Sequence, residues 1–409
     1  MHRHFAAHGF ATVLALALFA GAQTAEAATI NVSNASQLQN AVATANSAGG
    51  NTTILVANGT YTLTDTLYVN KPNVTIAGNP GSRASVIIQG DAMSASASVG
   101  TIIRVAASGF QLHDVTLQRS KFHLIQIVGE LNADSPVIKD CILRDAYEQM
   151  IKVSNNPSTP TQTGDGGLVE NCVFEYSAGI APQYYVGGID AHASKNWVVR
   201  NNTFRNIISP NTDVAEYAVH FWDNSANNIV ERNTIVNCDR GIGFGLNGKP
   251  NSGGIIRNNM IYHAANKGQF ADVGISLQES SNTLVQNNTV ILDNSITWAI
   301  EYRFGASQNV QIVNNLTNKP VRSRDGGTGT ESNNVSSAAN SWFVGATTGD
   351  LHLASAVSSV VDKGQAVSGL TDDFDGQSRP QGAGFDVGAD EYGGVSGKKP
   401  MPPTDISTN

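Results

Sequence analysis

The sequence predicts an all-β solenoid, in which each repeat forms one coil and equivalent residues stack in parallel sheets. The first observation is a recurring phrase of an apolar residue, any residue, a polar residue, Asn or Cys, and an apolar residue or Thr. Its copies begin at successive spacings of 31, 30, 31, 26, 29 and 27 residues, from IKDCIL (138–143) to IVNNLT (312–317). The second observation is a phrase after each copy in which apolar and polar residues alternate, as in MIKVSN (150–155) and AVHFWD (218–223). Alternation is the period of a half-buried strand, and a fixed repeat of this length is typical of stacked architectures. We therefore expect two short strands per coil.

Composition excludes several other classes of protein. The chain has 409 residues, with 25 Lys and Arg against 33 Asp and Glu, which gives a net charge of −8. A nucleic-acid partner would require a basic surface, so this balance argues against one. Hydrophobic residues make up 41%, enough for a core and too many for global disorder.

Residues 1–27 have the pattern of a secretory signal peptide. A short basic start is followed by an apolar run and by Ala25-Glu26-Ala27, a typical cleavage site. The alternative, a membrane anchor, would need an apolar run of about 20 residues, which this segment lacks. We expect a mature chain from about Ala28, without a membrane span, that is secreted or periplasmic.

The remaining chain is interpreted as one solenoid domain over residues 28–392, which we expect to be monomeric. Its first part, about 28–50, contains the amphipathic stretch Ser36–Ala48, which is suited to cap the open end of the first coil. Residues 346–392 form the expected closing segment. Residues 393–409 have the composition of a disordered tail.

The Asn at the bend of each coil is expected to form a ladder. Stacking places these residues in one column, where side-chain amides can bond to one another and to turn backbone: Asn202, Asn233, Asn259, Asn288 and Asn315. Cys141 and Cys172 occupy the same position in two earlier coils. They lie about one coil rise apart, which suits either a disulfide or two buried thiols.

With these phrases, the chain resembles the right-handed parallel β-helix proteins of the pectate-lyase-like superfamily over about residues 51–345. TTILVANGTYTL (52–63) and NVTIAG (73–78) are similar to the opening coils of that family. The resemblance implies a single-stranded right-handed parallel β-helix with a short N-terminal capping helix.

The alternating phrases also predict where the chemistry lies. Their apolar residues face inward, so their polar residues form two adjacent outward columns. The first column runs Gln126, Lys152, Asp190, His220, Gly243, Ser276, Glu301, and the second runs Val128, Ser154, His192, Trp222, Gly245, Gln278, Arg303. Histidines, a Trp, a Lys and an Asp on neighbouring coils are unlike a generic solvated face. The two glycines predict a dip in this wall, and a groove here would suit an extended polysaccharide.

Long insertions flank the same coils. They carry Tyr184, Tyr185 and Glu216, and Arg240 begins the coil after His220. Long loops on a rigid scaffold are where binding sites usually form. Arg240 is interpreted either as a group that points over the dip or as the salt-bridge partner of Asp239 or Glu231.

These residues favour β-elimination on a uronate-containing, acidic polysaccharide. The reaction requires a cation at the carboxylate, a base for the C5 proton and an acid for the leaving oxygen. We assign His220 as the favoured base, His192 as base or acid, Tyr185 as an alternative acid, and Arg240 and Lys152 as carboxylate-binding cations. The substrate-binding residues are predicted to be Asp190, Trp222, Glu216, Tyr184, Gln278, Glu301 and Arg303.

Three alternatives remain open from the sequence. A C5-epimerase would use the same groups, and a glycoside hydrolase would use two carboxylates such as Asp190 and Glu216. A non-catalytic glycan-binding or adhesin module would use the aromatic residues alone. No catalytic metal is assigned, although the closing-segment aspartates could hold Ca²⁺ instead of simply forming turns: Asp372, Asp373, Asp375, Asp386 and Asp390.

Overall fold

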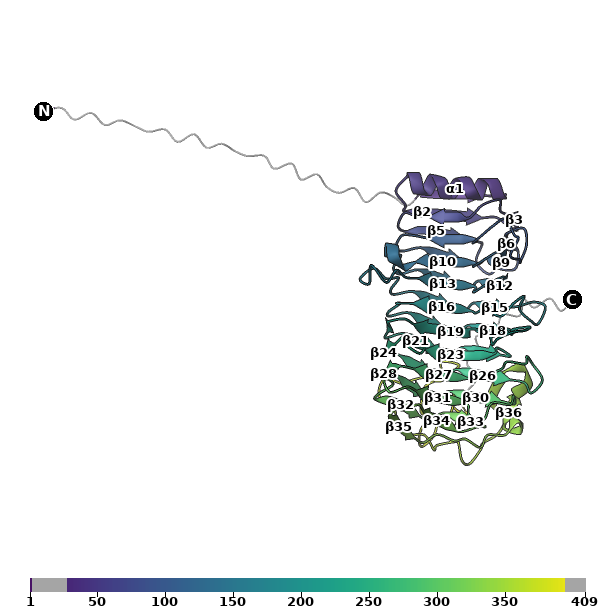
Figure 1. The fold of residues 1–409 in the computed structure, drawn as a ribbon, viewed down its shortest axis with the longest axis vertical. Coiled ribbons are helices and arrows are strands. Elements are labelled where there is room, and N and C mark those ends of the chain that lie inside the picture. The colour runs from purple at the N-terminus through teal and green to yellow at the C-terminus, as the bar shows by residue number, and fades with distance from the viewer. Residues whose placement is uncertain (2–27, 394–409) are drawn as a thin grey trace.

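The computed structural model describes residues 28–393 together with Met1. It is a right-handed parallel β-helix, drawn in Figure 1 as a column of stacked coils. The expected signal peptide and most of the expected tail lie outside the described residues. Over the described part, no helix is both long and apolar enough to cross a membrane.

The coils form three parallel sheets. The first sheet contains β1 (Ala28–Val32), β2 (Thr52–Val56), β5 (Val74–Ala77), β8 (Gln111–His113), β11 (Val137–Lys139), β14 (Leu168–Glu170), β17 (Val198–Arg200), β21 (Ile229–Glu231), β25 (Ile255–Arg257), β29 (Leu284–Gln286), β32 (Val310–Val313) and β35 (Gly329–Ser332). The second sheet contains β4 (Leu67–Val69), β7 (Ile103–Val105), β10 (Ile125–Val128), β13 (Ile151–Ser154), β16 (Ile189–His192), β19 (Tyr217–Trp222), β23 (Arg240–Phe244), β27 (Ile275–Gln278), β31 (Ile300–Arg303) and β34 (Val321–Arg324). The third sheet contains β3 (Gly59–Thr62), β6 (Val86–Gln89), β9 (Thr116–Ser120), β12 (Ile142–Ala146), β15 (Val173–Glu175), β18 (Thr203–Arg205), β22 (Thr234–Val236), β26 (Met260–His263), β30 (Thr289–Leu292) and β33 (Leu316–Thr317).

Smaller elements complete the fold. The short strands β20 (Ser225–Ala226), β24 (Asn251–Ser252) and β28 (Ser280–Ser281) pair in parallel, and β36 (Phe343–Gly345) pairs antiparallel with β37 (Asp350–Leu353). Single 3₁₀ turns cover Gly129–Leu131, Asn340–Trp342 and Ala346–Thr348. The expected capping helix is confirmed as α1 (Ala35–Ser47), which lies across the first coil in Figure 1. Asn34 begins it by accepting the Gln37 backbone N–H.

The prediction of two strands per coil was wrong, because the recurring phrase contains two strands and a bend between them. VRNNTF, for example, divides into β17 and β18 around Asn201 and Asn202. Asn201 has a φ of 57°, in the left-handed region that Asn tolerates better than most residues. The first residue of each bend pair thus turns the chain, and the second enters the core.

The predicted asparagine ladder is confirmed. Asn202 Nδ2 donates to Asn233 Oδ1 at 3.0 Å, and the same bond repeats through Asn259, Asn288 and Asn315. Each acceptor oxygen also takes the backbone N–H of the preceding ladder residue. Cys141 and Cys172 continue this column as buried free thiols. Burial raises the pKa of the Cys172 thiol well above its ordinary value, so this sulfur is protonated as well as buried.

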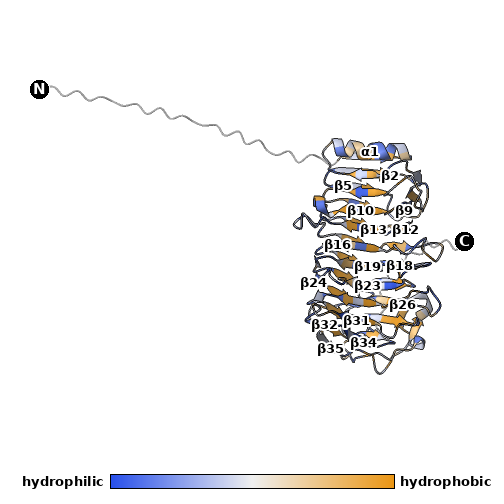
Figure 2. Cartoon of the chain, in the orientation of Figure 1, coloured by the Kyte–Doolittle hydropathy of each residue, from blue (hydrophilic) through white to orange (hydrophobic). Residues whose placement is uncertain are grey.

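The core fills the inside of the column, as the apolar strands of Figure 2 indicate. Outside it, residues 365–392 run along the coils and bind the turning residues of successive bends. Arg232 pairs with Asp372, Asn258 donates to the Asp372 carbonyl, and Asn287 donates to the Asp386 carbonyl. Asn314 donates to the Gln365 carbonyl. One residue of each bend pair therefore builds the ladder, and in these coils the other holds the closing segment.

Candidate functional site

The second sheet brings the predicted outward residues together. Lys152 on β13 pairs with Asp190 on β16, which pairs with His220 on β19. In the next outward column His192 pairs with Trp222. Neighbouring parallel strands lie about 4.8 Å apart, so residues far apart in the sequence meet on one wall. The central cluster is defined as Lys152, Asp190, His192, Trp222 and Asp223.

A lysine and a histidine contact each other directly in the central cluster. Lys152 Nζ donates to Asp190 Oδ2 at 2.5 Å and lies 2.8 Å from His192 Nε2. Trp222 Nε1 donates to Asp190 Oδ1 at 2.6 Å, so both carboxylate oxygens of Asp190 accept a hydrogen bond. The Trp222 ring also contacts the His192 ring, with centroids 4.2 Å apart. The cluster therefore holds a cation beside an imidazole, fixed by a buried carboxylate.

Asp223 fixes the other side of the imidazole. His192 Nδ1 lies 3.3 Å from Asp223 Oδ2, and Asn155 and Lys249 also donate to this carboxylate. When Nδ1–H donates to Asp223, Nε2 keeps its lone pair toward Lys152. Sequence reasoning missed all three residues. Asp223 ends the alternating phrase and could have been read from it, whereas Asn155 and Lys249 lie in loops that carry no repeat.

The charges of the central cluster follow from this geometry. Burial alone would raise the pKa of Asp190, but Lys152 and the neighbouring imidazoles hold that pKa below its usual range. Burial lowers the pKa of His192, with Asp190 opposing and Lys152 reinforcing the change. At neutral pH the cluster thus contains an ionised Asp190 and a neutral His192 with an available lone pair.

His123 lies at the edge of this cluster, just before β10. Its Nδ1 lies 3.1 Å from the Gln149 carbonyl oxygen. Burial lowers the pKa of His123 to about 4, so its imidazole is neutral over most of the physiological range.

His220 points outward from its strand but is not exposed, which corrects the expectation of a solvent-facing column. Its exposed fraction is 0%. Nε2 lies 3.1 Å from the Gly245 carbonyl oxygen, and the ring packs between Tyr217 and Trp222, with centroids 4.7 and 5.2 Å away. Aromatic side chains thus cover the imidazole that the sequence favoured as the base.

The predicted dip at Gly243 and Gly245 is wrong for the same reason. A Cβ on Gly243 would lie 2.7 Å from the Tyr217 ring, so that ring occupies the space that the glycine leaves. Gly245 has a φ of 74°, and a Cβ there would meet the Gln278 carbonyl oxygen. The glycines allow close packing of ring and backbone, and they do not open the wall.

Arg240 and Glu216 lie beside this buried ring cluster. Arg240 Nε is 3.4 Å from Asp272 Oδ2, and the guanidinium lies 5.1 Å from the Tyr217 ring centroid. Glu216 Oε2 is 3.3 Å from His220 Nδ1. Burial alone would raise the pKa of Glu216, but His220 lowers it. Arg240 thus pairs with an acid, but the partner is Asp272 and not Asp239 or Glu231, the two acids that the sequence suggested.

Tyr184 and Tyr185 lie on the segment between β15 and β16, with exposed fractions of 44% and 41%. Their rings contact each other, with centroids 6.5 Å apart. Two exposed aromatic side chains on a loop of this wall are available to a ligand that approaches from solvent.

The far end of the wall forms a separate group. Gln278 and Glu301 are buried, and Gln278 Nε2 lies 3.3 Å from the Tyr217 hydroxyl. Glu301 pairs with Arg324 and accepts from Trp298 Nε1. Arg303 pairs instead with Asp325, at 2.6 Å. These residues do not contact the central cluster.

Three of the closing-segment aspartates that the sequence related to Ca²⁺ bind protein groups. Asp373 accepts backbone N–H groups from Asp375, Gln377 and Glu391. Asp386 likewise accepts two, and Asp372 pairs with Arg232. Such contacts are typical of carboxylates that stabilise turns. Asp375 and Asp390 instead lie beside His352.

The comparisons with known proteins agree with this architecture. A family model described as the right-handed beta helix region matches residues 161–360. The chain carries a right-handed β-helix region. A search of curated proteins gave no match.

Solved structures extend the likeness to most of the chain. Pectate lyase Pel9A is similar over 85% of this chain and 90% of its own, with 14% identity and a TM-score of 0.55. An alginate lyase from Paenibacillus sp. covers 66% of this chain and 96% of its own, with 13% identity and a TM-score of 0.44. The A-module of mannuronan C-5 epimerase AlgE4 from Azotobacter vinelandii covers 74% and 95%, with 13% identity and a TM-score of 0.46. At such identities the likeness concerns the fold alone.

Proposed function

We propose that this β-helix is a secreted polysaccharide lyase that cleaves an acidic, uronate-containing glycan by β-elimination at the central cluster. The observation that carries the proposal is the 2.8 Å contact between Lys152 Nζ and His192 Nε2 on the outer wall. It pairs a cation for a sugar carboxylate with a neutral base for the adjacent C–H bond. Both side chains retain some exposure, 14% and 15%, whereas His220 has none.

In the proposed reaction the substrate carboxylate accepts a hydrogen bond from the Lys152 ammonium. This contact withdraws the ammonium from His192 Nε2, and it also makes the proton at C5 more acidic. His192 Nε2 then takes that proton, the electron pair forms the C4–C5 double bond, and the C4–O bond breaks. A general acid protonates the leaving oxygen.

The surrounding residues support these two roles. Asp190 holds Lys152 in place, and Asp223 holds the His192 tautomer whose Nε2 can accept a proton. Tyr185, exposed on the adjacent loop, remains our candidate for the general acid. Arg240 remains a second candidate for carboxylate binding, with Asp272 as its partner in the absence of substrate. His220 becomes a positioning residue that packs on Trp222.

The charges of Asp190 argue against the hydrolase alternative. A glycoside hydrolase needs one protonated carboxyl group as its acid. Asp190 accepts hydrogen bonds on both oxygens, and its lowered pKa keeps it ionised. Burial would raise the pKa of Glu216, but His220 lowers it as well, so neither carboxyl group of this pair is protonated at neutral pH. A C5-epimerase would use the same Lys152 and His192 but return a proton to C5 without breaking the C4–O bond.

The experiment is an activity screen of purified protein against acidic polysaccharides, with neutral glucans as controls. The proposal predicts an unsaturated uronate at the new non-reducing end, detected by ultraviolet absorbance and mass spectrometry. New reducing ends without unsaturation would indicate hydrolysis. Incorporation of solvent deuterium at C5 without cleavage would indicate epimerisation. Binding of a glycan with no chemical change would support the adhesin alternative, and each of these outcomes contradicts the lyase proposal.

A further inference from the structure

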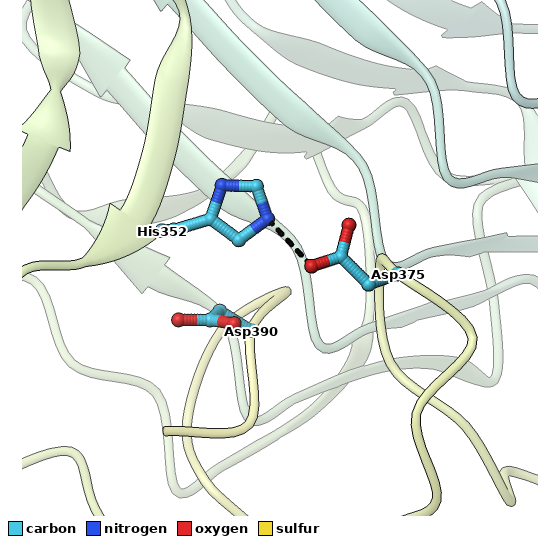
Figure 3. Close-up of side chains that lie close together, drawn as sticks. All are labelled: His352, Asp375 and Asp390. Carbon is cyan, nitrogen blue, oxygen red and sulfur yellow. Dashed lines mark ion pairs between the residues drawn. The ribbon is translucent and has the colours of Figure 1, made fainter. Parts of the chain in front are cut away.

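A second constellation of chemically active side chains lies near the C-terminal end of the described chain, apart from the central cluster. His352 on β37 faces Asp375 and Asp390 of the closing segment, as Figure 3 shows. One ligand atom from each residue lies within 4.8 Å of the other two. His352 Nε2 is 3.1 Å from Asp375 Oδ2. The three side chains come from parts of the sequence that only the fold brings together.

The imidazole is oriented as a metal-binding histidine is. His352 Nδ1 lies 2.5 Å from Asp350 Oδ1, so a carboxylate can accept Nδ1–H and direct the Nε2 lone pair toward Asp375 and Asp390. A carboxylate in this position is the usual support of a histidine that binds a metal through its other nitrogen. The Phe374 ring packs edge-on against the imidazole, with centroids 5.4 Å apart.

Buried Asp375 Oδ1 has no hydrogen-bond partner among the described residues, and His352 Nε2 has only its 3.1 Å ion pair with Asp375 Oδ2. Buried polar atoms are nearly always satisfied, so the unsatisfied oxygen beside this imidazole indicates a missing partner. Asp350, Asp375 and Asp390 surround one imidazole, so the site favours positive charge, which either a protonated His352 or a metal ion can supply. A metal ion in place of the Nε2 proton would bind the imidazole nitrogen and the carboxylate oxygens together.

We propose that His352, Asp375 and Asp390 bind a divalent transition-metal ion of the Zn²⁺ class, which joins the stretch 375–390 of the closing segment to β37. The imidazole distinguishes this class from Ca²⁺, which takes oxygen ligands. Tetrahedral Zn²⁺ bound at about 2.0–2.2 Å sets its ligand atoms about 3.3 Å apart. The Nε2–Oδ2 separation already matches this value, so rotation of Asp390 completes three ligands and leaves one position for water.

The metal ion would be structural, since it joins three separate stretches of chain. Asp373 holds Asp375 through its backbone N–H, and Asp390 Oδ2 accepts the Leu353 N–H at 2.8 Å. The ligands are thus attached to backbone that is already fixed on both sides. The proposal is independent of lyase activity, because the site contacts none of the central cluster residues.

The test uses the full mature chain, freed of metal with a chelator and then titrated with Zn²⁺ alone by calorimetry. We expect one Zn²⁺ per chain and a rise in the midpoint of thermal unfolding that saturates at one equivalent. Ca²⁺ and Mg²⁺ at equal concentration should not replace it. Absence of saturable Zn²⁺ uptake by the folded chain would overturn the proposal.

Variants locate the site. His352→Gln and Asp375→Asn should each weaken Zn²⁺ binding by about 100-fold or more, and Asp350→Asn by about 10–100-fold. His113→Gln, on the first sheet, is the matched control and should bind Zn²⁺ as the wild type does. If His352→Gln fails to fold, Asp375→Asn decides, because it keeps the size and shape of the side chain and removes only its charge. Unchanged uptake in Asp375→Asn would show that the cluster is an ion pair only.

Discussion

The asparagine ladder and the outward columns of the second sheet both run along this β-helix, but they differ in the residues that form them. The ladder at the bends repeats one residue type, is buried, and satisfies each amide with the next. The outward columns of the second sheet contain different residue types with opposite charges, and part of them reaches solvent. The ladder repeats because each bend has the same buried backbone groups to satisfy. Lys152, Asp190 and His192 do not repeat along the coils and are not needed for stacking, so we place the chemistry there.

The largest expected effect is on activity, and it separates the two histidines of the outward columns. His192→Ala removes the proposed base and should lower kcat by about 10²–10⁴-fold, while far-ultraviolet circular dichroism stays that of the wild type. His220→Gln keeps a donor for the Gly245 carbonyl and should lower kcat far less. Steady-state kinetics on a substrate found in the screen measures both. The reverse order of the two effects would return the role of base to His220.

Breaking the ladder should act on stability instead. Asn259→Ala leaves the Asn233 backbone N–H without its acceptor and removes one of the acceptors of the Asn233 side-chain amide. It also removes the amide that donates to the Val230 and Arg257 carbonyls and to Asn288 Oδ1, so five hydrogen bonds are lost in all. Each unsatisfied buried group costs about 1–3 kcal/mol, so the free energy of unfolding should fall by about 3 kcal/mol or more. Urea unfolding measures this change, with Asn40→Ala on the exposed side of α1 as the control. A loss no greater than that of the control would mean that the ladder is not a stabilising element.

His123, beside the central cluster, should make the free energy of unfolding depend on pH, whereas the asparagine ladder contains no group that titrates. The pKa of His123 is about 4 in the folded chain against an ordinary value of 6.5, so the unfolded chain binds more protons between these two pH values. The contribution of a neutral His123 is complete above pH 6.5 and is lost as the pH falls to about 4. It amounts to at most about 3 kcal/mol.

The difference between wild type and His123→Gln isolates this contribution from those of other groups. Unfolding free energies of both chains, measured at several pH values from 4 to 7.5, should converge toward the acidic end. His113→Gln, whose imidazole is only half-buried, should change the slope less. Parallel pH profiles for wild type and His123→Gln would contradict the assignment.

The smallest effect concerns the rim of the central cluster. Lys249 donates to Asp223 at 3.0 Å but is exposed by 44%. An exposed ion pair contributes about 0–1 kcal/mol, so Lys249→Ala should barely change the free energy of unfolding. Its effect on kcat should be below about tenfold and should shrink in high salt. A loss as large as that of His192→Ala would move Lys249 into the catalytic centre.

The sequence predicted the repeated parts of this molecule far better than the unrepeated ones. Stacking follows from the period, and the inward and outward faces follow from alternation, so the ladder and the second-sheet register could be derived residue by residue. The third strand of each coil was missed because a bend of two Asn interrupts it without breaking the phrase.

The sequence could not predict which outward side chains are buried beneath other side chains. Tyr217 begins its strand and folds over Gly243, and this single ring decides that His220 is buried and that no dip exists. Contacts of loop residues such as Asn155 and Lys249 with Asp223 depend on the path of insertions that obey no period. His352 lies beside Asp375 and Asp390 only because the chain after β37 folds back along the coils, and no local sequence pattern predicts that path.

The path of residues 365–392 along the coils also determines the order in which the coils unfold. A solenoid normally loses its terminal repeat first and then unravels one repeat at a time, since each touches only its neighbours. Here Arg232, Asn258, Asn287 and Asn314 belong to four consecutive bends, and all hold the same stretch of chain. None of the four can fray while that stretch is docked, so this end opens as a block. Hydrogen exchange would register a shared opening free energy for their amides.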